Sequence, residues 1–238
     1  MEALPGTGQL TALRRDCPPA TVGHMGEWNV ENWRGTAADF HEFVPSPQRA
    51  VWVVELTEPA LVLGSTQSTD SIDASAASRF GFAVARRHSG GGAVWLHPTQ
   101  SVWVDVTIPR DDSLWVDDVP SSMGWLGAAI VDALNGVQEA EVHRGAYEST
   151  ELARTVCFGG LAPGEVVTSG GKLVGISQRR TRDGARFQCV AYTTWTTEPW
   201  VEAIADDAIR ESASALDVAE LAMNTDQFVG RLLNSLPH

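Results

Sequence analysis

Lys172 is the single lysine among the 17 Lys and Arg residues of this 238-residue chain, and it lies in the glycine-flanked segment GGKLVG, residues 170–175. An ammonium group is a compact point donor, whereas the guanidinium group of arginine is a wide planar fork. A lysine at this one position therefore indicates a site that holds a small oxyanion. A surface lysine that escaped a general bias towards arginine would look the same, so the neighbouring segments must decide.

A run of three glycines, Gly90, Gly91 and Gly92, lies in RRHSGGGAVW, residues 86–95. Consecutive glycines cost conformational entropy, so they are expected where a ligand approaches the main chain or where φ must be positive. The segment has neither the GxxxxGK[ST] spacing of a P-loop nor the GxGxxG pattern of a dinucleotide-binding turn. It predicts a ligand-lining loop, with a plain glycine-rich hairpin loop as the alternative.

The thiols of the chain are Cys17, Cys157 and Cys189. Their odd number and their spacing fit neither a disulfide framework nor a CxxC site for zinc or redox chemistry. Each is therefore expected to be a free thiol, and no metal site is expected.

Charge and hydropathy exclude two classes of partner. The formal charge of −13 and the pI near 4.8 argue against nucleic acid, because nonspecific affinity for the phosphate backbone needs many Lys and Arg contacts. No run approaches the ~20 apolar residues of a membrane-spanning helix, and the N-terminus lacks the layout of a signal peptide. We expect a cytoplasmic protein that binds neither nucleic acid nor membrane.

Hydrophobic patterning predicts the elements that position these residues. Apolar runs predict strands at 51–56, 60–64, 82–87, 101–109, 172–180 and 185–195, a strand-like segment at 154–160, and helices at 35–43, 71–80 and 119–134. The short TEP turn joins the first two strands as a hairpin, and the turn at 182–184 joins the last two. Short helices follow residue 198.

This order of elements predicts an α+β fold with a mixed, largely antiparallel sheet and flanking helices. We expect one domain over residues 1–238, with an N-terminal arm over about residues 1–30 and no accessory C-terminal domain.

Three motifs together resemble a known superfamily. RRHSGGGAV at residues 86–94, followed by GGKLVGISQRR at 170–180, is similar to the paired signature of lipoate-protein ligase A, octanoyltransferases and biotin-protein ligases. PALVLGSTQS at 59–68 resembles the first ligand-lining strand and loop of that superfamily. The resemblance spans roughly residues 51–195. It implies a catalytic domain of the biotin/lipoate ligase type that encloses a medium-chain acyl group.

The resemblance also implies roles for particular residues. Lys172 matches the lysine that holds the acyl carbonyl, where an ammonium near developing negative charge can contribute several kcal/mol. The expected substrate-binding residues are Gly64, Gln67, Arg87, Ser89, Gly90, Gly91, Gly92, Gly175 and Ser177.

Two chemistries share this scaffold in the superfamily. Lipoate ligases use ATP and magnesium to form lipoyl-adenylate, whereas octanoyltransferases need no cofactor and carry octanoate from acyl carrier protein as a thioester on an enzyme cysteine. Both modify a lysine of a lipoyl-domain carrier, such as a dehydrogenase E2 or the glycine cleavage H protein. We expect the run Arg179, Arg180, Arg182 and Arg186 to dock such an acidic carrier.

The segment before Lys172 favours the transferase. Its Val-Cys-Phe tripeptide resembles the position of the nucleophile in the Gram-positive type of octanoyltransferase, and Glu165 followed by Val166 matches that group too. The ligases usually carry Asn-Asp where this chain has Gly164 and Glu165. Cys157 is therefore the candidate nucleophile, since a thiolate is the strongest nucleophile available near neutral pH. A small buried hydrophobe is the alternative for a free cysteine.

Other positions depart from the transferase pattern. Cys189 lies where the superfamily usually has histidine, and we expect it to fill space; His97 cannot be assigned to a role as a base or as a structural residue. The SGGG sequence at residues 89–92 also resembles the motif of the ligases more than that of the transferases. An ATP-dependent ligase and a catalytically inactive acyl-binding protein are therefore kept as alternative functions. Biotin attachment is a weaker alternative, because the GRGR-type loop is absent.

Overall fold

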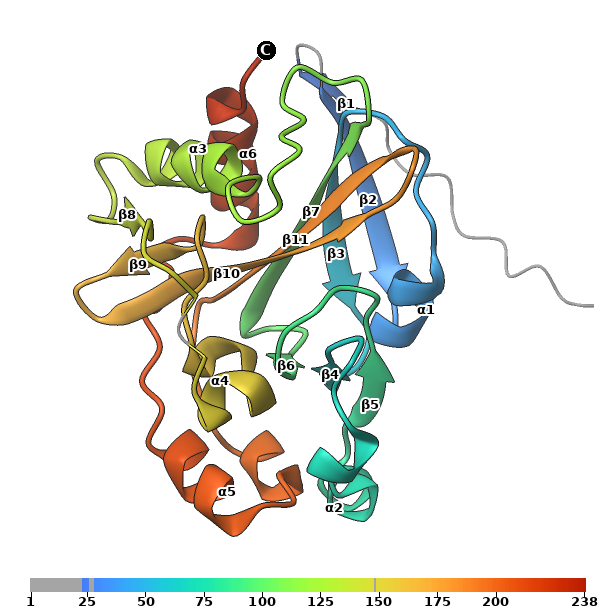
Figure 1. Ribbon diagram of the computed structural model, residues 1–238, viewed down its shortest axis with the longest axis vertical. Helices are drawn as coiled ribbons and strands as arrows, with labels where there is room; N and C mark the ends of the chain where they lie inside the picture. Colours follow the sequence, from blue (N-terminus) through green and yellow to red (C-terminus); the bar gives the residue numbers. More distant parts are fainter. Residues whose placement is uncertain (1–22, 26–27, 148) are drawn as a thin grey trace, which may run out of the picture.

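The computed structural model describes residues 23–25, 28–147 and 149–238, so Cys17 and most of the expected N-terminal arm lie outside the described residues. An eight-stranded sheet runs through the molecule (Figure 1). Its strand order is β1 (Gly23–Met25), β2 (Trp28–Gly35), β3 (Ala50–Leu56), β7 (Ser101–Pro109), β11 (Gly184–Tyr192), β10 (Gly171–Arg180), β9 (Val166–Thr168) and β8 (Glu141–Val142). Only β2 and β3 pair in parallel within this sheet of the described chain.

A second, three-stranded sheet holds β4 (Ala60–Leu63) between β5 (Ala83–Arg86) and β6 (Val94–Leu96). The predicted hairpin between 51–56 and 60–64 is therefore wrong, because β3 pairs with β2 and β7 in the large sheet. All four residues of β4 are buried, so this short strand behaves as a central strand with partners on both edges. The TEP turn carries the chain from one sheet to the other.

Helices cover both sheets. They are α1 (Ala37–Glu42), α2 (Ala74–Phe80), α3 (Gly124–Leu134), α4 (Glu151–Thr155), α5 (Asp207–Ser214) and α6 (Thr225–Ser235). In Figure 1, α3 and α6 lie together against the large sheet, and α2, α4 and α5 lie around the small one. One hydrophobic core joins α3 and α6 to β7, β10 and β11, and a second surrounds β4. No helix in the described ranges has the length and apolarity that a bilayer crossing requires.

The mixed, largely antiparallel α+β fold is confirmed, as are most predicted elements. The strand at 101–109 has the predicted bounds, and the β10–β11 hairpin forms with its turn before Gly184. The helix predicted from residue 119 begins only at Gly124, because the Val119 carbonyl accepts from the side chains of Ser122 and Gln178 in a turn. Sequence patterning did not predict β2, which lies within the expected arm and beyond it.

The segment around Cys157 differs most from its prediction. Residues 154–160 were predicted as strand-like, but α4 ends at Thr155 and Cys157–Gly159 forms a single 3₁₀ turn. The hydroxyl of Thr150 accepts from the Ala153 amide at 3.0 Å and so caps α4. Only Val156 keeps a strand-like contact, a parallel bridge to Ala93. Cys157 therefore begins a turn at the end of the glycine loop rather than lying within a strand.

Candidate functional site

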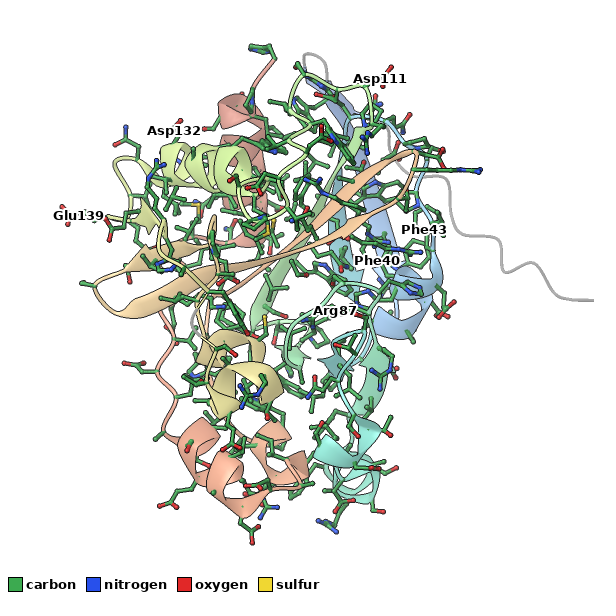
Figure 2. All side chains as sticks on the ribbon, in the orientation of Figure 1. Phe40, Phe43, Arg87, Asp111, Asp132 and Glu139 are labelled. Carbon is green, nitrogen blue, oxygen red and sulfur yellow. The ribbon has the colours of Figure 1, made fainter. Side chains whose placement is uncertain are left out.

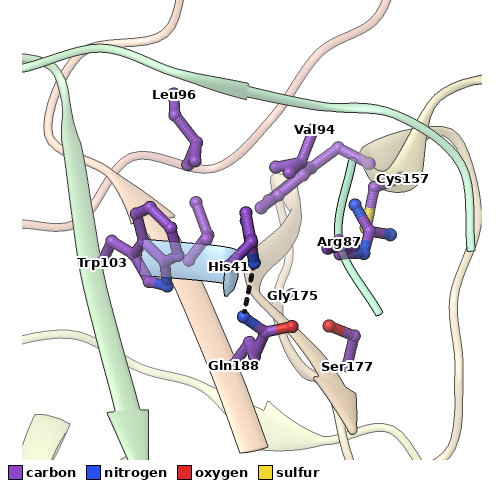
Figure 3. Close-up of a pocket in the computed structure, with 11 residues that line it drawn as sticks. His41, Arg87, Val94, Leu96, Trp103, Cys157, Gly175, Ser177 and Gln188 are labelled. Carbon is purple, nitrogen blue, oxygen red and sulfur yellow. Dashed lines mark hydrogen bonds between the residues drawn. The ribbon is translucent and has the colours of Figure 1, made fainter. Parts of the chain in front are cut away.

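Two adjoining cavities mark the candidate site. The apolar cavity lies between the small sheet and β10–β11 (Figure 3). Its apolar walls are Val94, Leu96, Trp103, Phe158 and Val190. The lysine cavity contains Lys172, Glu165 and the glycine run 90–92. Cys157 and Ser177 line both cavities, so the two spaces meet beside the thiol.

The glycine loop is wedged between two other backbones. A Cβ on Gly64 would lie 1.9 Å from the Gly91 carbonyl oxygen, and a Cβ on Gly92 would lie 2.7 Å from the Val156 nitrogen. Gly91 also has a φ of +99°, which favours glycine. Glycine is therefore required because main chain meets main chain here, and the loop holds the end of β4 against the segment that carries Cys157.

Two arginines organise the carbonyl groups of these loops. Arg87 is only 3% exposed and donates to the carbonyls of Val62, Gly90 and Gly92 at 3.2, 2.8 and 2.8 Å. Arg86 donates to the carbonyls of Gly64 and Gln67, each at 2.7 Å. Such multiple contacts suit the five-donor fork of a guanidinium group.

The Arg87 guanidinium also lies beside the Cys157 thiol (Figure 3). Burial lowers the pKa of Arg87, and the neighbouring Cys157 and Glu165 oppose this effect. An arginine remains charged even so, because a guanidinium group is not deprotonated in proteins. Arg87 is therefore a buried cation beside the Cys157 thiol.

The backbone of Cys157 is held on both sides. Its amide donates to the Ala93 carbonyl at 2.8 Å, and the Ala93 amide donates to the Thr155 carbonyl at 2.8 Å. The Gln67 side chain donates to the same Thr155 carbonyl at 3.1 Å and accepts from the Gly64 amide at 3.3 Å. Gly64 and Gln67 therefore support the loop from behind, and neither lines one of the two cavities.

Lys172 lies on β10 with its ammonium group buried. Its Nζ donates to the Cys157 carbonyl at 2.8 Å and forms an ion pair with Glu165 at 2.8 Å. Burial opposes the charged form, but Glu165 and Cys157 outweigh it and raise the pKa of Lys172. The pairing of β10 with β9 shifts register between Lys172 and Val174, and Lys172, Ile176, Ser177 and Gln178 of β10 line the lysine cavity.

The contacts of this ammonium leave room for a ligand. Nζ lies 2.8 Å from the Cys157 carbonyl and 3.0 and 2.8 Å from the two oxygens of Glu165, and the Phe158 ring centroid is 5.1 Å away. A lysine has three donors. If the Glu165 carboxylate shares one of them between its oxygens, the third donor is left for an acyl oxygen in the lysine cavity.

A polar network crosses the apolar cavity from β10 to β7. The buried Ser89 hydroxyl lies 3.0 Å from the Ser177 hydroxyl and donates to Gln188 Oε1 at 2.7 Å. The Gln188 amide nitrogen donates to Asp105 Oδ2 at 3.3 Å. Asp105 is fully buried and pairs with Arg186 at 2.5 Å. The Ser89 side chain is therefore held by residues of β10 and β11, and the network continues through Gln188 to β7.

His41, on α1, ends this network. Its Nδ1 lies 3.3 Å from the Gln188 amide nitrogen (Figure 3), and its ring packs against Trp103 with centroids 5.0 Å apart. Burial, with Arg186 and Arg87 nearby, lowers the pKa of His41 from 6.5 to about 3. His41 is therefore a neutral imidazole at neutral pH.

This pKa shift predicts acid sensitivity. The unfolded chain protonates His41 near pH 6.5 but the folded chain only near pH 3, so the His41 contribution is present above 6.5 and is lost as the pH falls. Between about pH 7 and about pH 5 the loss should be about 2 kcal/mol. Urea unfolding of wild type and His41→Phe at both pH values checks this. A difference between the two proteins that does not change with pH would contradict it.

The structure brings together the predicted residues Cys157, Lys172, Arg87, Ser89, Gly90, Gly91, Gly92, Gly175 and Ser177. Sequence reasoning missed His41, Trp103 and Gln188, which carry no motif and come from α1, β7 and β11. Glu165 was noticed in the sequence, but not as the partner of Lys172. A charge-pairing argument, that a buried lysine needs a carboxylate, could have found it.

Two residues with open roles lie away from the cavities. Cys189 is 1% exposed in the core of the large sheet, and burial together with Asp105 raises the pKa of its thiol well above the usual value. This position agrees with the expected packing role. His97 is half-buried after β6, bonds within its own turn to the Thr99 amide, and lines neither cavity.

The arginine run of β10 and β11 does not form one docking face. Arg186 is buried against Asp105, so the expectation that it docks a partner is wrong. Arg180 donates to the carbonyls of Val116 and Asp117, and its guanidinium lies over the Trp115 ring.

Figure 2 shows the acidic residues Asp111, Asp132 and Glu139 at the outside of the molecule, whereas Arg87 lies within it.

The chain matches one known protein family. A family model described as the lipoyl protein ligase A/B catalytic domain matches residues 31–235. None of the curated proteins compared with the chain matches it.

Solved structures share its fold. Protein Ta0514 of Thermoplasma acidophilum with bound lipoic acid has 14% identity and a TM-score of 0.64, with 89% of this chain and 84% of that one covered. A lipoate-protein ligase A bound with ATP has 15% identity and a TM-score of 0.65, with the same coverage. A bipartite lipoate protein ligase of T. acidophilum, analysed with its E2 lipoyl domain, has 17% identity and a TM-score of 0.61, covering 89% and 82%.

Proposed function

Because the chain belongs to the lipoyl protein ligase A/B catalytic domain family, we propose that it attaches a lipoyl or octanoyl group to a lysine of a lipoyl-domain carrier protein. We further propose that the acyl group passes through a thioester on Cys157, and that residues 1–238 act as a single catalytic domain. The observation that carries the thioester is the position of Cys157, which lines both cavities beside Arg87 and Lys172.

In the first step, the Cys157 sulfur attacks the carbonyl carbon of an acyl thioester, such as that of acyl carrier protein. The bond to the donor sulfur breaks, and the donor leaves as a thiol with the proton that Cys157 gave up. The third donor of Lys172 stabilises the oxyanion that develops on the carbonyl oxygen. The acyl chain lies in the apolar cavity, between Val94, Leu96 and Trp103.

In the second step, the amine of the carrier lysine attacks the Cys157 thioester. An amide bond forms, the carbon–sulfur bond breaks, and the amine proton returns to the Cys157 sulfur. We assign the lysine cavity to this amine, because it is the second space that Cys157 lines and the acyl chain occupies the first. A lipoyl domain as carrier is supported by the E2 lipoyl domain that was analysed with a structurally similar ligase.

An ATP-dependent ligase is the second candidate, favoured by the similar structure that holds ATP. The lysine cavity offers the space for a nucleotide beside Lys172. The magnesium ion of such a reaction needs free carboxylate oxygens. Glu165 is the one acidic side chain among the described residues that line this cavity, and its oxygens accept from Lys172 and from the amides of Ala162 and Ile176. These residues do not fit the metal, and we derive no step through it.

Intact-mass spectrometry with octanoyl acyl carrier protein tests the proposal. Wild type is expected to gain one octanoyl group that hydroxylamine removes, and Cys157→Ala is expected to gain none. Cys189→Ala is the matched control, because it removes a buried thiol outside both cavities and should keep the adduct.

Each other outcome has a defined meaning. An adduct that persists in Cys157→Ala would assign the nucleophile elsewhere. Transfer of lipoate that needs ATP, yields pyrophosphate and survives Cys157→Ala would replace the thioester by the ligase reaction. Acyl binding without transfer to any lipoyl domain would show that the protein is not a transferase.

A further inference from the structure

The apolar cavity contains one polar atom without a partner. His41 lines the cavity and is 4% exposed, yet its Nε2 has no hydrogen-bond partner among the described residues. A buried polar atom left without a hydrogen-bond partner destabilises the folded protein. Such an atom in a cavity therefore indicates a ligand that supplies what is missing.

The hydrogen-bond network identifies which group is missing. Gln188 accepts from the Ser89 hydroxyl through Oε1, so the opposite end of its amide, the NH₂ group, faces Asp105 and His41. His41 Nδ1 must therefore accept a hydrogen bond. Because His41 is a neutral imidazole, its single ring proton lies on Nε2. The unpartnered atom is an N–H donor, and it needs an acceptor.

The His41 N–H donor lies where the distal end of a bound acyl group would be. Figure 3 shows Arg87 and Cys157 on one side of the cavity, Trp103 and Leu96 on the other, and His41 between them, with its ring packed against Trp103. An acyl group bound with its carbonyl at Lys172 would extend from Cys157 towards His41. Ser177 and Gln188 also line the cavity, but their polar side chains bond within the network, so His41 Nε2 is the unpartnered buried nitrogen among the described lining residues.

We infer that His41 selects acyl chains that carry a sulfur or oxygen acceptor near their distal end, and therefore the lipoyl group over the octanoyl group. This inference rests on the proposed function and narrows its substrate. The distal end of an octanoyl group offers only a methyl group, which leaves the His41 donor unpaired. The dithiolane of a lipoyl group offers two sulfurs, which are weak acceptors and also pack well against aromatic rings such as Trp103.

Calorimetric binding of lipoic acid and octanoic acid to the full chain tests the inference. Wild type is expected to bind lipoic acid more tightly, and His41→Phe should reduce the ratio of the two affinities about five-fold, in keeping with the loss of one hydrogen bond. Leu96→Met is the matched control, since it changes the same end of the cavity without a donor, and it should keep the wild-type ratio. An equal ratio in wild type and His41→Phe would overturn the inference.

A second measurement uses wild type alone, in case His41→Phe does not fold. In ¹⁵N-labelled protein, the Nε2–H resonance of His41 should shift on addition of lipoic acid and much less on addition of octanoic acid. Equal shifts with both acids would refute the selection of lipoyl. Tighter binding of lipoic acid by wild type, with no octanoyl adduct from octanoyl acyl carrier protein, would reject the proposed function but not the selectivity. Binding of neither acid would reject the selectivity, whereas the adduct formed from octanoyl acyl carrier protein tests the proposed function separately.

Discussion

Replacing Lys172 by methionine together with Glu165 by glutamine is expected to lower the rate of acyl transfer to a lipoyl domain at least about 100-fold, the usual cost of removing an oxyanion donor. The pair must be changed together. Lys172→Met alone leaves the Glu165 carboxylate buried at 2% exposure without its counter-charge, and breaking a buried ion pair on one side costs about 3–5 kcal/mol. A single variant could lose activity through unfolding.

Lys172→Arg is the matched control for charge. It keeps a cation beside Glu165, but its planar fork cannot replace a compact ammonium in a cavity bounded by the Cys157 carbonyl. We expect a similar loss of the transfer rate in single-turnover assays, with thermal melting to establish that both variants fold. Transfer within two-fold of wild type in a folded double variant would remove Lys172 from the reaction.

The second large effect concerns the ion pair of Asp105 and Arg186. Arg186→Met should destabilise the protein by about 3–5 kcal/mol, because it leaves a fully buried carboxylate with only the Trp103 indole and the Gln188 amide as partners. The double variant Asp105→Leu with Arg186→Met should recover part of this loss, since no charge is then buried. Urea unfolding of the three proteins measures both steps. Equal stability of Arg186→Met and wild type would show that the pair contributes nothing.

The destabilisation by Arg186→Met should also depend on pH. Burial raises the pKa of Asp105 above its usual value even though Arg186 lowers it, and removal of Arg186 should raise it further. A carboxyl group whose pKa is higher in the folded state stabilises the fold at low pH and loses that contribution as the pH rises. The difference between wild type and variant should therefore grow from about pH 4 to about pH 7.

The sequence determined the elements with regular patterns and the residues with unusual chemistry. The apolar runs at 101–109 and on both sides of Gly184 predicted β7 and the β10–β11 hairpin, and the structure buries β7 and β11 on both faces. The solitary Lys172, the glycine run 90–92 and Cys157 could be identified because each residue type is rare for a physical reason. The motifs also indicated the family that the comparison then established.

Only the tertiary structure decided which residues meet. Local pattern joined 51–56 to 60–64 as a hairpin, but the pairing of each strand depends on burial of its edges by distant segments. His41 and Gln188 carry no local signal, since they contact each other across 147 positions of sequence. The counter-charge of Lys172 likewise depends on tertiary packing, which buries Lys172 on β10 beside Glu165. Residue types fix which reactions are available, whereas packing fixes the neighbours that make one of them possible.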